Sequence, residues 1–211
     1  MLLVFGFVPI WTMVIAEDGF YVIPTNKNNY APVEKTGQAT CYENSGTVIE
    51  CSGTGQDGEH QKGVASPTPR FTDNGDGTVT DHLTGLIWLK NGNCFKFYFS
   101  NFTTQNNRTW EKALTSANLL ASGYCGLTDG SSAGDWRLPN YKELISLLDL
   151  GQDNPALPSD NLIQAQNNLY WSSTTIEDAR NNAWSVDLRS GVGTNRAKVQ
   201  SWYVLAVRGG Q

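Results

Sequence analysis

The clearest structural signal in this chain is Arg70-Phe-Thr-Asp-Asn-Gly-Asp-Gly-Thr-Val-Thr-Asp81. Its two ends, Arg70–Asp73 and Thr78–Asp81, are rich in residues that favour β-strands. Between them, Asn74–Gly77 contains an Asn-Gly and an Asp-Gly pair, which supply the positive φ angles that tight hairpin turns require. We therefore predict a β-hairpin here, followed by an apolar strand over Leu83–Lys90.

Helices and further strands are expected downstream of this hairpin. Thr109–Ala121 places apolar residues at helical spacing, and Asn140 with Glu143 has the form of a capping box, which predicts a second helix over Asn140–Leu150. Short strands are predicted over Leu169–Thr175, Ala183–Arg189, Arg196–Gln200 and Trp202–Arg208. This order favours the α+β class, with two helices segregated from antiparallel strands.

The chain begins with an uncharged apolar segment. Met1–Ala16 ends in Val-Ile-Ala before the acidic Glu17, which is typical of a secretory signal peptide, and it is shorter than the ~20 residues that cross a bilayer. A buried helix or strand and a retained anchor are the alternatives. We interpret residues 17–37 as a linker, 38–66 as a small cysteine-stapled segment and 67–211 as the main domain, with no membrane span once the signal is removed.

Four cysteines fit an exported protein in an oxidising compartment. They allow three disulfide connectivities. We favour Cys41–Cys51 and Cys94–Cys125, because each pair brackets a compact local unit. A zinc site is not expected, since the chain has no C-x-x-C motif and its two histidines lie far from ligand-like spacing.

The net charge argues against nucleic-acid binding, and its distribution along the chain indicates a basic C-terminal segment. The 211 residues carry a net charge of -5, which argues against general nucleic-acid binding, since phosphate contacts need clustered Lys and Arg. The last 32 residues, Arg180–Gln211, hold five basic side chains against a single Asp, a net +4. Such a segment can attract an anionic ligand, although basic residues also protect exposed strand edges.

Three sequence motifs resemble the patterns of functional sites but lack the neighbouring elements or the spacing that those sites require. Gly53–Gly58 matches G-x-G-x-x-G but lacks the strand and helix of a dinucleotide fold. Gly130–Gly134 matches G-x-S-x-G, yet both histidines precede Ser132 in the chain. Asp73–Thr78 lacks the spacing of a calcium loop. No catalytic residue, cofactor or metal ligand is therefore expected.

Several motifs in order resemble one family. They are Pro69–Asp81, Thr84–Lys90, Gly134–Asn140, Glu143-Leu144, Tyr170–Thr175, Ala183–Val186 and Tyr203 with Val207–Gly210. This set is similar to the C-terminal domain family of the Legionella collagen-like protein, over Pro67–Gln211. The resemblance implies a C-type-lectin-like fold and a secreted or surface module that binds ligands, sulfated glycosaminoglycans among them, with no known catalysis. The collagen-like repeat and the Glu-Pro-Asn and Trp-Asn-Asp tripeptides of calcium-dependent lectins are absent here.

The tentative ligand site combines the basic C-terminal residues with an aromatic and an amide. Its members are Arg180, Arg189, Asn195, Arg196, Lys198 and Trp202. Arg137 and Arg208 are expected in structural ion pairs, and Trp88, Trp136, Trp171 and Trp184 in the core. The hypothesis is an adhesin-like module of the periplasm, the cell surface or the medium that binds an anionic glycan. The alternative is protein recognition or assembly, including homo-oligomers, and an enzyme on the same scaffold is the least favoured interpretation.

Overall fold

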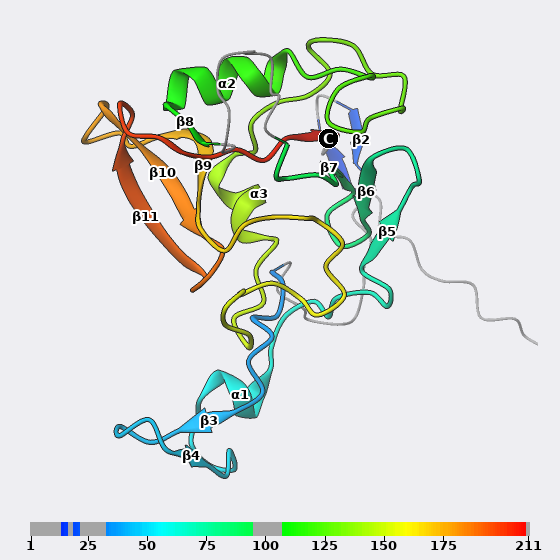
Figure 1. Ribbon diagram of the computed structural model, residues 1–211. Helices are drawn as coiled ribbons and strands as arrows, with labels where there is room; N and C mark the ends of the chain where they lie inside the picture. The colour runs from blue at the N-terminus through cyan, green and yellow to red at the C-terminus, as the bar shows by residue number, and fades with distance from the viewer. Residues whose placement is uncertain (1–13, 17–18, 22–32, 95–106, 210–211) are drawn as a thin grey trace, which may run out of the picture.

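The computed structural model describes residues 14–16, 19–21, 33–94 and 107–209 (Figure 1). Most of the predicted signal peptide and most of the predicted linker lie outside these residues. Their described parts include β1 (Val14–Ala16) and β2 (Gly19–Tyr21), which pair antiparallel. Among the described residues, no helix has the length and apolar content needed to span a bilayer.

The predicted hairpin at residues 70–81 is confirmed. β5 (Phe71–Asp73) and β6 (Thr78–Asp81) pair antiparallel, with Phe71 opposite Asp81. The turn between them contains two glycines with positive φ, Gly75 at 77° and Gly77 at 87°. β7 (Leu86–Leu89) pairs with β6, and β13 (Val207–Gly209) pairs with β7. Together they form a four-stranded antiparallel sheet in the order β13-β7-β6-β5.

The second large sheet has five strands in the order β11-β10-β9-β12-β8. Their bounds are Leu169–Thr175 for β9, Asn182–Asp187 for β10, Val192–Ala197 for β11, Trp202–Tyr203 for β12 and Asn107–Arg108 for β8. All neighbours are antiparallel except β12 and β9. The prediction for β9 has the correct bounds, whereas β11 begins and ends earlier than the predicted strand at residues 196–200.

The last apolar run was predicted as one strand and is divided between the two sheets. β12 belongs to the five-stranded sheet and β13 to the four-stranded sheet. The residues between them are fully buried but lie outside both strands. Leu205 packs into the core cluster that contains Trp88, while Val204 and Ala206 pack into the cluster that contains Trp136 and Trp171. The run is apolar throughout because it crosses between two cores.

Three helices occur among the described residues. α2 (Trp110–Asn118) lies within the predicted range, and α3 (Tyr141–Ile145) begins with the predicted capping box at Asn140. A short helix at residues 57–60, α1 (Asp57–His60), was not predicted. The described chain is therefore α+β with mostly antiparallel sheets, as expected.

α3 ends before the predicted Leu150 because tertiary partners take its backbone hydrogen bonds. The side chain of Arg70 donates to the carbonyl of Ser146. The N–H of Asp149 donates to Ala156 O at 3.1 Å, and the N–H of Leu150 donates to Thr36 O at 2.7 Å. Apolar periodicity continues past Ile145, since Leu147 and Leu148 are buried, but the backbone is no longer helical.

Both predicted disulfides are present, Cys41–Cys51 and Cys94–Cys125. The first links a small unit that projects from the body of the protein, which we name the lobe and define as residues 39–61 (Figure 1). Within it, β3 (Cys41–Tyr42) pairs with β4 (Val48–Ile49), and α1 packs against β3. The fully buried Cys41 lies at the centre of this unit.

Candidate functional site

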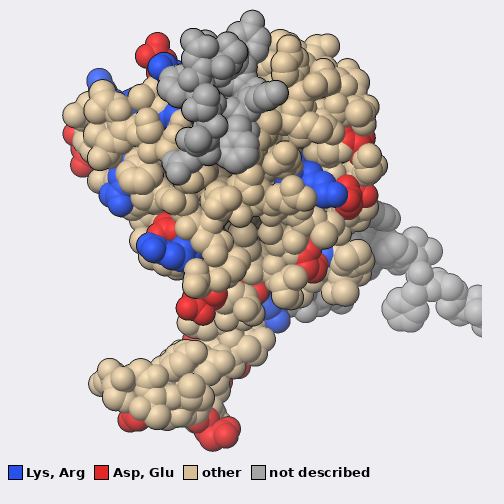
Figure 2. Space-filling view, viewed as in Figure 1, with Lys and Arg blue, Asp and Glu red and all other residues tan. Residues whose placement is uncertain are grey.

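Two of the predicted site residues are engaged by nearby acids. Arg180 donates to Glu177 at 2.6 Å on the exposed loop before β10, and Arg189 donates to Asp187 at 3.1 Å beside the β10–β11 turn. Glu177 lies just outside the segment whose charge was counted. Figure 2 accordingly shows Lys and Arg dispersed over the face in view, several of them beside Asp or Glu. The net +4 of the C-terminal segment is not concentrated in one basic patch on that face.

The ammonium group of Lys198 is held by contacts with other parts of the same chain. Its ammonium lies 4.0 Å from the ring centroid of Trp110. It also donates to Thr175 Oγ1 and to the carbonyl of Arg180, each at 2.9 Å. These contacts join the turn after β11 to β9, to the start of α2 and to the loop before β10. Lys198 therefore fixes the end of the sheet.

Arg196 and Trp202 come together at a shallow pocket of about 460 Å³. The guanidinium carbon of Arg196 lies 5.6 Å from the indole centroid of Trp202. Its Nη1 donates to the carbonyl of Asn195 at 3.0 Å and to Thr194 Oγ1 at 3.3 Å. Its Nε and Nη2 make no hydrogen bond with the described residues, so they are available to a ligand. We name this site the Arg196 pocket, and its lining residues are Asn182, Asn195, Arg196, Ala197, Gln200 and Trp202.

Asn195 contributes to this site differently from what the sequence suggested. In the β10–β11 register, Arg196 is opposite Ala183 and Asn195 is opposite Trp184. Because successive side chains of a strand point to opposite faces, the Asn195 amide lies on the face of Trp184 and away from Arg196. Only its carbonyl supports the guanidinium. Trp184 itself is half-buried and packs against Tyr141, with ring centroids 4.8 Å apart.

The indole of Trp202 is packed into the core and has a buried polar atom without a partner in the described part of the chain. Its ring packs against the core cluster that contains Trp171. Its Nε1 is buried and has no hydrogen-bond partner among the described residues. A buried donor without a partner is unfavourable by about 1–3 kcal/mol.

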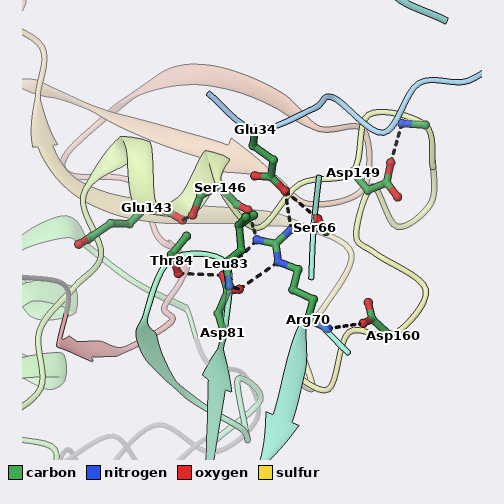
Figure 3. Close-up of polar contacts among 11 residues, drawn as sticks. Glu34, Ser66, Arg70, Asp81, Leu83, Thr84, Glu143, Ser146, Asp149 and Asp160 are labelled. Atoms are coloured by element: carbon green, nitrogen blue, oxygen red, sulfur yellow. Dashed lines mark hydrogen bonds and ion pairs between the residues drawn. The ribbon is translucent and has the colours of Figure 1, made fainter. Parts of the chain in front are cut away.

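Sequence reasoning missed a second polar centre, which is built on Arg70 (Figure 3). Arg70 is fully buried at the start of the hairpin. Its Nη1 donates to Glu34 Oε1 at 2.8 Å, and its own N–H donates to Asp160 at 3.1 Å. The guanidinium also bonds both carboxylate oxygens of Asp81 and the carbonyl of Ser146. Residues 34, 81, 146 and 160 therefore all meet at Arg70.

The electrostatics of this centre are set by burial. Loss of solvent around Glu34 raises the pKa of its carboxyl above the usual 4.5, although the neighbouring Arg70 lowers it. A pocket of about 310 Å³ adjoins the pair, between residues 34–37, 65–70 and 158–160. Among the described residues, no cluster of three or more His, Cys, Asp or Glu could hold a metal ion. The centre fastens the chain that precedes the lobe to the main domain.

Two other arginines have the structural roles that the sequence predicted. Arg137 makes a bidentate pair with Glu143, at 2.7 and 2.6 Å. Burial raises the pKa of Glu143, but the hydrogen bonds from Arg137 and from the N–H of Asn140, together with the charge of Arg137, lower it by more, so the pKa lies below its usual value. Arg208 pairs with the buried Asp129 at 3.2 Å and lies over the ring of Trp136. Trp88, Trp136 and Trp171 are fully buried, as expected.

Comparison with known proteins assigns the chain to a family. A search of curated proteins finds no match to the chain. The family described as the Lcl C-terminal domain matches residues 77–208, which include β6 through most of β13 and all six predicted site residues. Because this match covers more than half of the sequence, the chain belongs to the Lcl C-terminal domain family.

Proposed function

We propose that this protein is an exported binding module that recognises an anionic glycan through the Arg196 pocket. The observation that carries the proposal is the pairing of a guanidinium with an indole in an open pocket. Arg196 lies over Trp202, and two of its nitrogens have no bond to the described residues. In the described part of the chain, no other cation of the predicted site both lies over an aromatic ring and lines this open pocket.

The chemistry of the pocket suits a sugar that carries a carboxylate or a sulfate. A guanidinium is a planar fork of donors that binds such groups with two parallel hydrogen bonds. An indole face offers apolar surface to the C–H groups of a pyranose ring. The amide of Gln200, which lines the same pocket, is suited to hydroxyl groups.

Export and binding without chemical conversion are parts of the same proposal. Two disulfides are compatible with a periplasmic, surface or secreted location. A C-type-lectin-like fold, expected from the resemblance, is consistent with the α+β architecture. The family assignment names no ligand, so the proposal of an anionic glycan rests on the resemblance and on the chemistry of the pocket.

Heparin oligosaccharides test the pocket directly. We expect the chain to bind them at low salt and to release them as NaCl rises, because the contact is partly ionic. Arg196→Gln should weaken binding at least tenfold, since a hydrogen bond to a charged group contributes ~1.5–3 kcal/mol. Arg180→Gln is the matched control, because it removes the same charge from an exposed side chain outside the pocket.

Two results would overturn the proposal. One is the absence of binding at low salt to heparin and to a panel of uronate-containing and sialylated glycans. The other is equal weakening by Arg196→Gln and Arg180→Gln, which would indicate attraction by net charge without a defined site. Mass analysis of the oligosaccharide after prolonged incubation addresses catalysis, and a shortened or desulfated product would show an enzyme instead.

A further inference from the structure

The two faces of the β10–β11 strand pair differ in chemistry. One face carries the guanidinium of Arg196, opposite Ala183. Because side chains alternate along each strand, the other face is formed by the intervening residues, none of which is charged. We name it the Trp184 face, and its residues are Asn182, Trp184, Val186, Gly193, Asn195 and Ala197.

Helix α3 holds the aromatic centre of this face in place. It packs against β9 and β10 (Figure 1), and the ring of its first residue, Tyr141, lies beside that of Trp184 with an angle of 31° between the ring planes. Glycine at position 193 makes room for the tyrosine, since a Cβ there would overlap Tyr141 Oη. The N–H of Tyr141 also donates to Thr174 Oγ1 at 3.1 Å. The Trp184 indole is therefore positioned by contacts within the chain.

The polar groups around the indole have no partners in the described part of the chain. Trp184 is half-buried, and its Nε1 reaches solvent, as does the hydroxyl of Tyr141. Asn195 is exposed directly across from Trp184, and Asn182 is half-buried two positions earlier in β10. Both asparagines also border the Arg196 pocket, but alternation directs their amides to the Trp184 face. An aromatic surface is thus surrounded by an N–H, a hydroxyl and two amides.

We propose that the Trp184 face binds an uncharged sugar ring, which stacks on the indole and exchanges hydrogen bonds with the amides of Asn182 and Asn195. An indole offers apolar surface to the C–H groups of a pyranose, and an amide both donates to and accepts from hydroxyl groups. A carboxylate or sulfate would find no cation among the residues of this face. An apolar protein surface is a poorer occupant, because it would leave these polar groups covered and without partners.

The proposal does not rest on the Arg196 pocket, since the two sites are on opposite faces of the strand pair. It is tested with uncharged oligosaccharides, namely chitotetraose, cellotetraose and maltotetraose, each added to the full chain up to about 10 mM, because weak sugar sites have millimolar affinity. The NMR signals of the seven tryptophan indole N–H groups are recorded, and that of Trp184 is assigned by its loss in Trp184→Phe. At least one sugar should shift the Trp184 signal to saturation, with no effect of NaCl. A Trp184 signal that none of the three sugars shifts would overturn the proposal.

A pair of asparagine variants separates a defined site from general contact with sugar. Asn195→Ala should weaken binding about fivefold, because it removes hydrogen bonds to the sugar. Asn118→Ala is the matched control, since it removes an exposed amide from α2, outside the Trp184 face. The indole signals other than that of Trp184 show whether each variant is folded. Equal affinities of the two variants for the sugar would contradict the assigned site.

Arg196→Gln distinguishes this site from the proposed anionic one. The variant is designed to impair heparin binding, and it should bind the uncharged sugar within about twofold of wild type, because no charge takes part in that contact. Conversely, Asn195→Ala should bind heparin as wild type does. If Arg196→Gln instead abolished binding of the uncharged sugar, the sugar would be in the Arg196 pocket and the proposal for the Trp184 face would be wrong.

Discussion

Both carboxylate oxygens of Asp81 accept hydrogen bonds from the guanidinium of Arg70, Oδ1 from Nε and Oδ2 from Nη2, each at 3.1 Å. The two side chains are almost completely shielded from solvent. Asp81 also accepts from the N–H of Leu83 at 3.0 Å and from Thr84 Oγ1 at 2.9 Å. The ion pair is thus fully hydrogen-bonded, which is the condition under which buried charges are tolerated in a protein core.

Removal of Arg70 should destabilise the protein strongly. In Arg70→Met, the carboxylate of Asp81 stays buried without its cation, and such a broken pair lowers the free energy of unfolding by about 3–5 kcal/mol. Urea unfolding with the disulfides intact measures the change. Lys90→Met is the control, because Lys90 pairs with Asp73 at partly exposed positions, where an ion pair contributes ~1 kcal/mol or less. Similar losses in the two variants would contradict the importance of burial.

Glu34 and Glu143 both bind an arginine, yet they should have opposite effects on the pH dependence of stability. The pKa of Glu34 is raised in the folded state, so between the ordinary value of 4.5 and the raised value the folded state holds more protons. The stability that Glu34 contributes is therefore present below pH 4.5 and is lost as pH rises through its folded pKa. The pKa of Glu143 is lowered, so its contribution is present above pH 4.5 and is lost as pH falls.

Urea unfolding of wild type, Glu34→Gln and Glu143→Gln, between about pH 3 and about pH 7, checks this contrast. The stability difference between wild type and Glu34→Gln should shrink as pH rises. The difference between wild type and Glu143→Gln should grow over the same range. Parallel curves for the two variants would show that burial of Glu34 does not prevail over its contact with Arg70.

The parts of the structure that the sequence predicted correctly are mostly local. The hairpin at residues 70–81 follows from its turn residues, and the α3 capping box follows from Asn140 and Glu143. The site at Arg70 could not be predicted, since it joins positions as distant as Glu34 and Asp160. Register could have placed Asp81 near Arg70, but nothing in the sequence indicates that Ser146 would end a helix there.

The structure divides the residues of the predicted ligand site for a similar reason. A charge count over a segment does not show which cations already have partners, so Arg180, Arg189 and Lys198 were grouped with Arg196. Adjacent positions in a strand were also treated as one surface, although alternation separates the amide of Asn195 from Arg196. Trp202 was included because it lies beside the polar residues Gln200 and Ser201, where an aromatic side chain is expected to point outward.

The two disulfides should differ in what they stabilise. The loop-entropy estimate gives about 3 kcal/mol for Cys41–Cys51, which are 10 residues apart, and about 4 kcal/mol for Cys94–Cys125, which are 31 apart. Because the first bridge lies within the lobe, replacement of Cys41 and Cys51 by Ser should open the lobe and leave the main unfolding transition nearly unchanged. Replacement of Cys94 and Cys125 should lower that transition. Hydrogen exchange and urea unfolding distinguish the two effects, and a lowered main transition in the first variant would refute the separation.

Two glycines of the hairpin turn allow backbone strain to be separated from steric overlap. Both have positive φ, so Ala at either position carries the left-handed penalty of ~1 kcal/mol. At Gly75 a Cβ would meet nothing within 4 Å, whereas at Gly77 it would lie 2.4 Å from the carbonyl oxygen of Gly126. That carbonyl belongs to the segment that docks on the turn, where the N–H of Thr128 donates to Asp76 O at 2.8 Å. Gly75→Ala should therefore lower the free energy of unfolding by about 1 kcal/mol, and Gly77→Ala by about 3 kcal/mol, because backbone overlap adds 1–3 kcal/mol. Urea unfolding measures both variants, and weaker protection of the Thr128 amide from hydrogen exchange should accompany only Gly77→Ala. Equal losses would mean that the turn is not held against residues 126–128, and the close packing of the hairpin on that segment would then be wrong.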